Sequence, residues 1–284
     1  MHAATDWQDY TLIDAGGGEK LENWAGIILR RPDPVAVWPQ NPSEPLWKNP
    51  HATYHRSNKG GGSWQFHKKI PTQWQVTYQN LRFHIKPTPF KHTGLFPEQA
   101  TNWQWLRATI AAAPRSPDIL NLFAYTGAAT VAAASAGANL CHVDASKSIV
   151  TWARENLALS GLADRPVRWI VDDAQKFLER EHRRGKKYHA IIMDPPSYGR
   201  GTTGEIWQFE DHIARLLTAC ARILDDNPLF VLINSYTAGF SPLIWPPLLE
   251  SVGLRGKTEL CELALPIGNS AHLLPCGTTV RWRP

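Results

Sequence analysis

Residues 119–127 read Ile-Leu-Asn-Leu-Phe-Ala-Tyr-Thr-Gly, an apolar run of strand length that ends in a turn with a single glycine. Similar short apolar runs occur further along the chain, at 140–143, 167–171, 189–193 and 229–233. Strands that are apolar on both faces and alternate with helices are typical of a parallel sheet covered on both sides. We therefore predict an α/β fold with a doubly wound, mostly parallel, Rossmann-like sheet of seven strands.

The segments between these runs have the end signals of helices. Pro114 would end a helix over 98–113, and Ser146 is placed to N-cap a helix that stops near Gly161. Further helices are expected at 127–136, 174–184, 208–224 and beyond Pro242, followed by a closing hairpin with strands at 254–265 and 277–283.

The first third of the chain has a different pattern. Residues 1–90 contain many Gly and Pro residues and short alternating runs, which predict a smaller β-rich domain. The glycine triplets at 16–18 and 60–62 are interpreted as tight turns, because neither follows a buried strand and opens a helix. Residues 91–284 would then form the sheet domain.

Positive charge is concentrated in this first third. The net charge is +5, and residues 1–97 hold 11 Lys and Arg against 7 Asp and Glu (11 − 7 = +4), together with 6 of the 13 Trp. Basic residues interleaved with aromatic ones can form a nucleic-acid surface, with cations on phosphates and rings under bases. The same composition also fits a small β-domain with a Trp core and a mildly basic surface, so both interpretations stay open.

Composition argues against several protein classes. The mean hydropathy is −0.32, and no stretch approaches the roughly 20 apolar residues of a membrane helix. The N-terminal residues lack the pattern of a secretory signal. The four cysteines lie far apart without metal-ligand spacing. We expect a cytoplasmic protein with reduced thiols and neither a membrane segment nor a metal site.

Polar residues follow four of the predicted strands, at the end of the sheet where such folds bind ligands. The first turn has only Gly127, whereas a pyrophosphate site needs Gly-x-Gly-x-x-Gly. Asp144 follows the second strand and suits a ribose diol. Residues 172–174, Asp-Asp-Ala, follow the third, where a carboxylate could accept from an adenine amino group, and 194–198, Asp-Pro-Pro-Ser-Tyr, follow the fourth. This set predicts an adenosine ligand without pyrophosphate, such as S-adenosylmethionine.

The sequence resembles the class I S-adenosylmethionine-dependent methyltransferases, in the branch that includes the large-subunit ribosomal RNA methyltransferases RlmI and RlmK. Four motifs within residues 85–240 carry the resemblance, at 92–99 (His-Thr-Gly-Leu-Phe-Pro-Glu-Gln), 121–127, 143–146 and 194–201. The resemblance implies S-adenosylmethionine as cofactor and RNA, most plausibly ribosomal, as substrate and partner.

The resemblance also implies a set of cofactor-binding residues at the strand ends. The turn at 123–127 would lie against the methionine moiety, Asp144 would hold the ribose, and Asp173 or its neighbour would contact the adenine. Gln99 corresponds to a position near the cofactor carboxylate, although the arginine that usually follows it is Ala100 here. The whole set is Gln99, Phe123, Tyr125, Thr126, Gly127, Asp144, Ala145, Ser146, Asp172, Asp173, Ala174 and Asp194.

The acceptor atom is expected to be a nitrogen. Methylation of cytosine C5 needs a cysteine nucleophile, and the two places where the family carries it read Pro196-Ser197 and Asn234-Ser235. Asp194, Pro195, Pro196 and Tyr198 form the expected catalytic set. Asp194 would accept a proton or hydrogen bond, and Tyr198 would form a pocket wall unless it is a packed loop aromatic.

Substrate contacts are expected just beyond this set. Ser197 is assigned to the substrate side, and 199–204 is interpreted as a mobile loop in which Arg200 reaches a substrate phosphate. Three alternatives remain open: methylation of a protein or small molecule, a non-catalytic RNA-binding relative, and a nicotinamide-dependent dehydrogenase. The single glycine of the first turn argues against the dehydrogenase.

Overall fold

The computed structural model describes residues 1–57, 61–200, 206–237 and 239–284, with the side chain of Arg200 excepted. The chain divides into two compact units. The first comprises Met1–Thr101 and Leu263–Cys276, and the second comprises Asn102–Glu262 and Gly277–Pro284. The sequence predicts one boundary, between residues 90 and 91, whereas this division falls after Thr101, Glu262 and Cys276.

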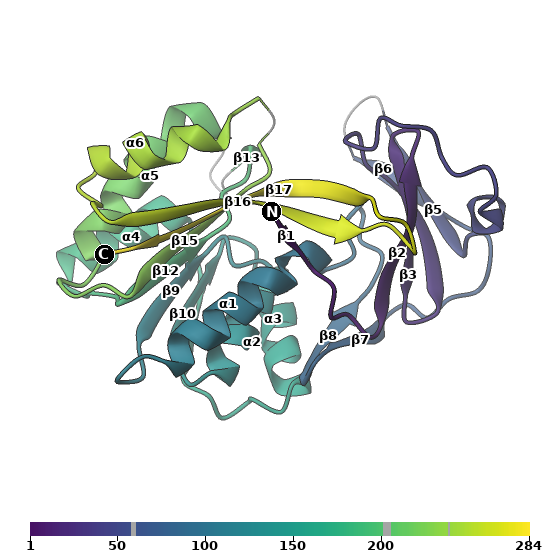
Figure 1. Ribbon diagram of the computed structural model, residues 1–284. Helices are drawn as coiled ribbons and strands as arrows, with labels where there is room; N and C mark the ends of the chain where they lie inside the picture. Colours follow the sequence, from purple (N-terminus) through teal and green to yellow (C-terminus); the bar gives the residue numbers. More distant parts are fainter. Residues whose placement is uncertain (58–60, 201–205, 238) are drawn as a thin grey trace. The chain divides into compact units, whose positions relative to one another are not determined.

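The largest sheet of the described residues has the strand order β1-β16-β17-β15-β12-β9-β10-β11 (Figure 1), and its strands from β15 to β11 lie in the second unit. Its parallel centre consists of β9 (Asp118–Leu122), β10 (Asn139–Asp144), β11 (Val167–Val171), β12 (Ala190–Met193) and β15 (Phe230–Ser235). β16 (Lys257–Pro266) and β17 (Leu273–Arg283) complete it, and β17 runs antiparallel to β15. The strand order reverses at β9, so the predicted doubly wound, mostly parallel sheet is confirmed.

An eighth strand joins the seven that the sequence predicts. β1 (His2–Ala3) pairs in parallel with Leu263 and Ala264 of β16. Two residues carry no periodic signal, so such a strand can be identified only through its partner.

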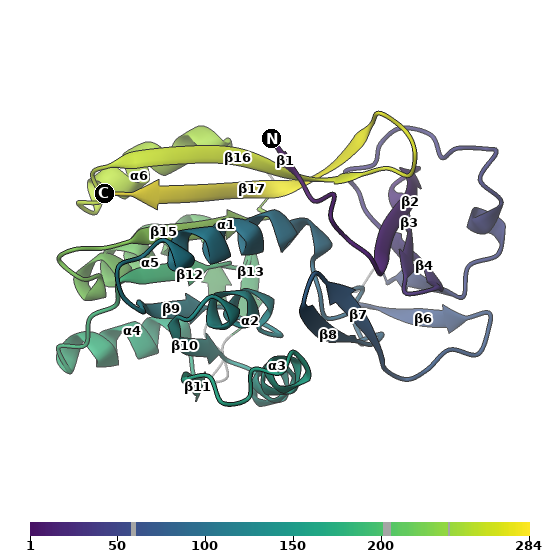
Figure 2. The same ribbon diagram turned by 60° about the horizontal axis from the view of Figure 1, so that its bottom comes forward.

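Helices cover both faces of the sheet (Figure 2). One apolar core joins strand residues such as Leu120 and Ile191 to α4 (Ala174–Arg183), α5 (Phe209–Ile223) and α6 (Trp245–Ser251). On the opposite face lie α1 (Ala100–Ala111), α2 (Ala128–Ser135) and α3 (Lys147–Leu159). On this second face, the ring of Trp105 in α1 contacts the ring of Phe230 in β15.

The helix starts next to the strand ends use different caps. α3 begins after Ser146 as predicted, but the Ser146 hydroxyl makes no capping bond and instead lies 3.1 Å from the Ser148 hydroxyl. α4 is capped by Asp173, whose Oδ1 accepts from the Lys176 N–H at 2.9 Å. Capping of this kind satisfies a backbone donor that has no partner within the helix.

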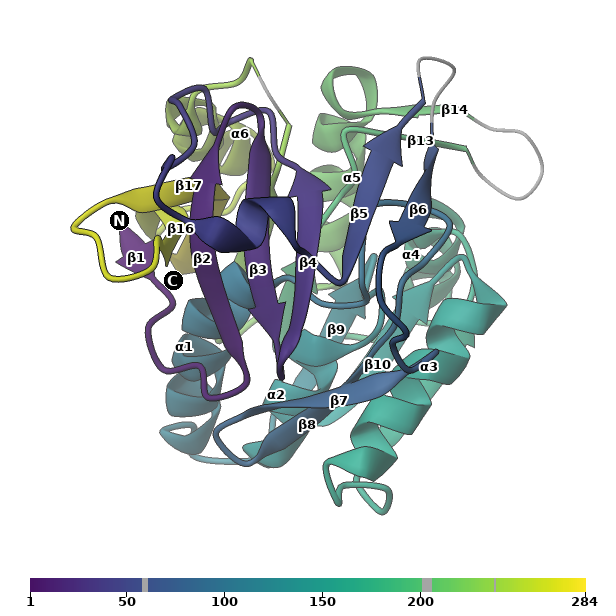
Figure 3. The ribbon, with the colours of Figure 1, turned by 90° about the vertical axis from the view of Figure 1, so that its right-hand side faces the viewer.

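The first unit is β-rich, as expected (Figure 3). Its five-stranded sheet has the order β2-β3-β4-β5-β6, formed by β2 (Tyr10–Gly16), β3 (Glu19–Trp24), β4 (Ile27–Pro32), β5 (Ala52–Arg56) and β6 (Gly62–Phe66). β7 (Trp74–Tyr78) and β8 (Leu81–Ile85) form a separate hairpin. Gly17 and Gly18, at φ 60° and 77°, form the predicted turn between β2 and β3. Gly60 of the second triplet lies outside the described residues.

A charged group is buried inside this unit. The Glu22 carboxylate, which is 0% exposed, accepts from Arg31 at 2.6 and 2.7 Å and from the Tyr10 hydroxyl at 3.0 Å. Burial by itself would raise the pKa of Glu22, but the Arg31 and Lys20 charges together hold it below its usual value. Part of the Trp-rich composition is also core, since Trp24 and Trp47 are buried.

The segment 263–276 belongs to the first unit, although the sequence suggested the second. The Gly268 N–H donates to the Leu12 carbonyl at 2.7 Å, and Leu12 forms a bridge with Ile267. These pairings join residues more than 250 positions apart, so local sequence patterns cannot reveal them. No helix in the described part of the chain has the length and apolar character needed to cross a membrane.

Candidate cofactor-binding site

The parallel register brings four strand ends to one edge of the sheet. Leu122 of β9 pairs with both Val143 and Met193, and Asp144 pairs with Val171. Because the residues that follow these partners lie at the same level, the predicted strand-end residues of the second unit come together. The order of strands reverses at β9, which is where open α/β sheets form their ligand crevice.

The turn after β9 holds an unusual backbone conformation. Phe123 and Tyr125 have φ values of 52° and 49°, in the left-handed region that non-glycine residues rarely adopt. Backbone bonds hold the turn: the Ala124 N–H donates to the Val143 carbonyl at 3.1 Å, and the Gly127 N–H to the Ala124 carbonyl at 3.0 Å. Strain of this kind, about 1–3 kcal/mol per residue, is typical of functional sites.

Gly127 is needed because α3 packs closely against the turn after β9. At φ 81°, a Cβ added to this residue would lie 2.8 Å from the Ala153 Cβ. Nearby, the buried Asn156 side chain donates to the Thr126 carbonyl at 2.9 Å. The single glycine therefore serves close packing of turn and helix, which agrees with a ligand that has no pyrophosphate.

Asp144 joins the ends of β9 and β10. Its Oδ2 accepts from the Tyr125 N–H and its Oδ1 from the Ser146 N–H, both at 2.9 Å. Burial raises the pKa of Asp144, and these two backbone donors oppose the rise. Each carboxylate oxygen keeps further acceptor capacity, so a half-buried Asp144 can also receive the two hydroxyls of a ribose. Of its neighbours, Ala145 is exposed and Ser146 half-buried.

The residues after β11 already have structural partners. Asp172 pairs with Arg180 at 2.7 Å, and its Oδ1 accepts from the Asp173 N–H at 2.9 Å. Asp173 caps α4, and Ala174 is buried in its first turn. The Asp172 N–H donates to the Asp144 carbonyl at 3.1 Å, which ties this turn to the neighbouring strand.

The turn after β12 contains the expected catalytic set. Asp194 and Pro196 are half-buried, Pro195 is buried, and Tyr198 is 54% exposed at the start of the short strand β13 (Tyr198–Arg200). The exposure of Tyr198 does not fit a packed loop aromatic. The Ser197 hydroxyl lies 2.9 Å from that of Thr237, which follows β15.

Trp207 connects two of these turns, and the sequence reasoning missed it. It lies in β14 (Ile206–Gln208), which pairs with β13. Its indole N–H donates to the Pro196 carbonyl at 2.6 Å, and its ring contacts that of Phe123 at 5.6 Å. A lone Trp in the short segment after a glycine-rich loop has no spacing that would mark this role.

A second missed feature is a buried polar network behind β15. Asn102 of α1 donates to Asn234 at 2.9 Å, and its Oδ1 accepts from Arg281 at 2.9 Å and from Thr279 at 3.2 Å. These residues come from three separate parts of the chain. They fix the end of β15, where the sequence reasoning looked for a cysteine.

Two predicted residues fall outside this arrangement. Gln99 is buried in the first unit, at the end of the short helix η2 (Pro97–Gln99) that leads directly into α1. The side chain of Arg200 and residues 201–204 of the expected loop lie outside the described residues.

The donor set fits an adenosine ligand without phosphates. The edge offers carboxylates and backbone groups, and no group of three or more His, Cys, Asp or Glu in the described residues could hold a metal ion. The cysteines are free thiols, and none of the four follows a strand at this edge. Burial raises the pKa of Cys141, inside β10, to about 11.

Comparison with known proteins agrees with this geometry. The S-adenosylmethionine-dependent methyltransferase family matches residues 52–243. A ribosomal RNA large subunit methyltransferase K/L from Syntrophotalea carbinolica is 30% identical over 64% of this chain and 25% of its own length. One from Shewanella sediminis is 30% identical over 80% of this chain and 30% of its own length. The chain thus spans only 25–30% of the length of these curated relatives.

A solved structure covers almost the whole chain. A methyltransferase from Agrobacterium tumefaciens, described as dependent on S-adenosylmethionine, has 37% identity and a TM-score of 0.92. The similarity covers 98% of this chain and 91% of that one. Both units therefore have a counterpart of the same fold.

Proposed function

Because the chain belongs to the S-adenosylmethionine-dependent methyltransferase family, we propose that it methylates a nitrogen atom of RNA, with ribosomal RNA in the cytoplasm as the substrate. The main support for the cofactor site is the hydrogen bond from the Tyr125 N–H to the Asp144 carboxylate. It joins the ends of β9 and β10, where the strand order of the sheet reverses. The names of the curated relatives support ribosomal RNA.

We assign the cofactor to the strand-end residues. Bound S-adenosylmethionine supplies a methyl group activated by its sulfonium. Asp144 holds the ribose hydroxyls, the strained turn at 123–127 lies along the methionine part, and the turn at 172–174 borders the adenine. Asp172 already pairs with Arg180, and Asp173 accepts from the Lys176 backbone N–H. A ligand would therefore use the remaining lone pairs of these two carboxylates.

The methyl acceptor belongs at the turn after β12. Alignment of the acceptor with the methyl group provides most of the catalysis in such a transfer. As the nitrogen–methyl bond would form and the methyl–sulfur bond would break, the acceptor nitrogen would lose a proton, and we assign its acceptance to the Asp194 carboxylate. Trp207 holds the Pro196 carbonyl, and the exposed Tyr198 ring can stack on a base. The absence of cysteine from this turn favours nitrogen over cytosine C5.

A patch on the first unit supports an RNA substrate. We call it the aromatic patch and define it by Trp64, Phe66 and Phe90. Trp64 and Phe66 stack at 6.5 Å on edge strand β6, and Phe66 and Phe90 are 54% and 62% exposed. The exposed cations Arg56 and Lys68 flank β6 in the sequence. Rings for bases beside cations for phosphates are the elements of single-strand binding.

The deciding experiment is transfer of a labelled methyl group to total RNA, ribosomal subunits, total protein and small molecules in parallel. Incorporation into ribosomal RNA, recovered as an N-methyl base after digestion, supports the proposal. Label in protein alone would overturn the RNA part and leave the methyltransferase. Failure to bind S-adenosylhomocysteine, or a preference for NAD, would overturn both.

A further inference from the structure

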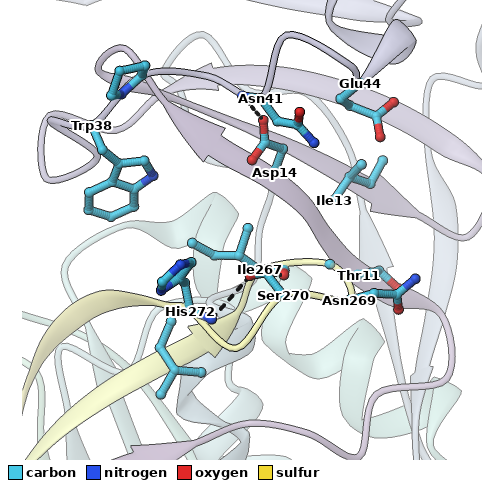
Figure 4. Close-up of a pocket in the computed structure, with 13 residues that line it drawn as sticks. Thr11, Ile13, Asp14, Trp38, Asn41, Glu44, Ile267, Asn269, Ser270 and His272 are labelled. Atoms are coloured by element: carbon cyan, nitrogen blue, oxygen red, sulfur yellow. Dashed lines mark hydrogen bonds between the residues drawn. The ribbon is translucent and has the colours of Figure 1, made fainter.

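A cavity of about 1020 Å³ lies within the first unit (Figure 4). Residues of β2, the segment 38–44 and the turn 267–273 line it. None of them belongs to the strand-end site or to the aromatic patch. A volume near the upper end of ordinary ligand sites has room for a side chain and part of its backbone.

The cavity has a flat aromatic wall. Trp38 points into it, and its indole N–H donates to the Ala15 carbonyl at 2.6 Å, which fixes the ring. Ile13 and Ile267 add apolar surface. A held indole beside aliphatic groups is suited to a planar ligand group.

A buried carboxylate faces the same space. Asp14 is only 8% exposed, and its Oδ2 accepts from the Asn41 N–H at 2.9 Å and from the Trp47 indole at 2.7 Å. Its Oδ1 has no hydrogen-bond partner anywhere in the described part of the chain. An oxygen of a largely buried carboxylate that has no protein partner can accept a hydrogen bond from an incoming donor.

The charge of the lining selects the kind of donor. Glu44 is a second carboxylate, and its Oε1 accepts from the Leu46 N–H at 2.9 Å, which orients it. The lining contains no Lys or Arg, and its ionisable side chains are the two carboxylates and the imidazole of His272, in a chain whose net charge is +5. Phosphate groups are therefore disfavoured there, and cations are favoured.

We propose that this cavity binds the guanidinium of an arginine side chain on a partner polypeptide. A guanidinium is planar, stacks on indole and donates two parallel hydrogen bonds to a carboxylate. Trp38 supplies the stacking surface, Asp14 Oδ1 the acceptor without a protein partner, and Glu44 the second charge. The site is independent of the methyl-transfer proposal, since it uses none of the same residues.

Calorimetric titration of the full chain with short arginine-containing peptides tests the proposal. Matched peptides with citrulline, which is planar but neutral, or with lysine, which is charged but not planar, are the controls. We expect the arginine peptide to bind at least tenfold more tightly than either control, with an affinity that falls as salt rises.

Variants locate the binding. Glu44→Gln keeps an oxygen for the Leu46 N–H and removes one charge, so it should weaken the arginine peptide about tenfold. Trp38→Phe should weaken it as well. Glu210→Gln, an exposed acid in α5, should have no effect. Asp14 also accepts hydrogen bonds within the fold, so the Asp14→Asn variant could lose stability. Its melting temperature is therefore measured together with its affinity for the peptide.

Several results would overturn the proposal. Equal binding of the arginine and citrulline peptides would remove the role of charge, and unchanged binding in Glu44→Gln and Trp38→Phe would place the peptide elsewhere. Displacement of the peptide by a short oligoribonucleotide would reassign the cavity to a nucleobase. Free arginine amide binding as tightly as the peptide would make the ligand a small molecule.

Discussion

The Tyr125 backbone N–H donates to the Asp144 carboxylate at 2.9 Å, across the boundary between the β9 turn and the end of β10. One carboxylate therefore holds the left-handed turn and borders the candidate ribose position. A change at Asp144 acts on both the shape of the turn and the ligand contact.

Asp144→Ala should weaken S-adenosylhomocysteine binding by about tenfold to a hundredfold. The loss of one charge-assisted hydrogen bond costs about 1.5–3 kcal/mol of binding free energy. A loss of about 1.4 kcal/mol weakens the affinity tenfold. Asp144→Asn keeps acceptor capacity and should lose less. Calorimetric titration measures both, with Asp164→Ala on the exposed loop as the matched control. Wild-type affinity in Asp144→Ala would remove Asp144 from the site.

Cofactor binding should weaken in acid at a higher pH than an ordinary aspartate would cause. Burial raises the pKa of Asp144, and the ribose contact needs its ionised form. As pH falls through this raised pKa, the carboxylate becomes protonated and loses acceptor capacity. Titrations of S-adenosylhomocysteine across acidic pH check this, and Asp144→Asn should lack the same pH step.

Gly127→Ala should destabilise the second unit by about 2–5 kcal/mol. The left-handed conformation of a non-glycine residue costs about 1–2 kcal/mol, and the added methyl would lie 2.8 Å from the Ala153 Cβ, an overpacking cost of about 1–3 kcal/mol. In the double variant with Ala153→Gly, removal of the overpacking should recover part of the loss. Denaturant unfolding measures the series, and a neutral Gly127→Ala would contradict the packing role.

Trp207→Phe should lower the rate of methyl transfer more than it lowers cofactor affinity. The substitution removes the indole donor to the Pro196 carbonyl, worth about 0.5–1.5 kcal/mol, and leaves a ring beside Phe123. Single-turnover rates and calorimetry separate the two effects. Trp169→Phe, on β11, is the matched control. A loss confined to cofactor affinity would assign Trp207 to the cofactor instead.

Phe66→Ala should weaken RNA binding about fivefold to a hundredfold, because stacking of one base on an aromatic ring is worth about 1–3 kcal/mol. Binding of S-adenosylhomocysteine should not change. Leu243→Ala, which removes an even more exposed apolar side chain in the second unit, controls for general surface effects. If both variants bind RNA like the wild type, the aromatic patch is not the RNA surface.

Arg31→Met should destabilise the first unit by about 3–5 kcal/mol, because the buried Glu22 loses its closest cation and both short hydrogen bonds. The double variant Glu22→Leu/Arg31→Met should recover most of this loss. In the wild type, the folded pKa of Glu22 is depressed. Its contribution to stability is therefore present above the ordinary glutamate pKa and is lost as pH falls through the depressed value. Denaturant unfolding at several pH values measures both effects.

The main strands and helices of the sheet domain, and the polar residues that follow its parallel strands, could be predicted from the sequence. The run 167–171 became β11 with the same bounds, and the helix predicted at 174–184 became α4, at Ala174–Arg183. These elements follow from local patterns: a buried strand must be apolar over its whole length, and a helix must satisfy its first donors. The parallel register then brings residues such as Asp144 and Asp194 to one edge without further information.

Other features depended on contacts between distant residues. The connection of Phe123, Trp207 and Pro196, the pairing of Glu22 with Arg31, the bridge of Leu12 to Ile267, and the cavity beside Trp38 all join separate segments. Each residue alone is an ordinary Trp, charge or apolar side chain. The sequence pattern determined most of the helices and strands and the residues that follow each parallel strand, because these depend on neighbours in the chain. Only the tertiary structure decided which side chains meet, because burial and hydrogen bonding act between residues that folding brings together.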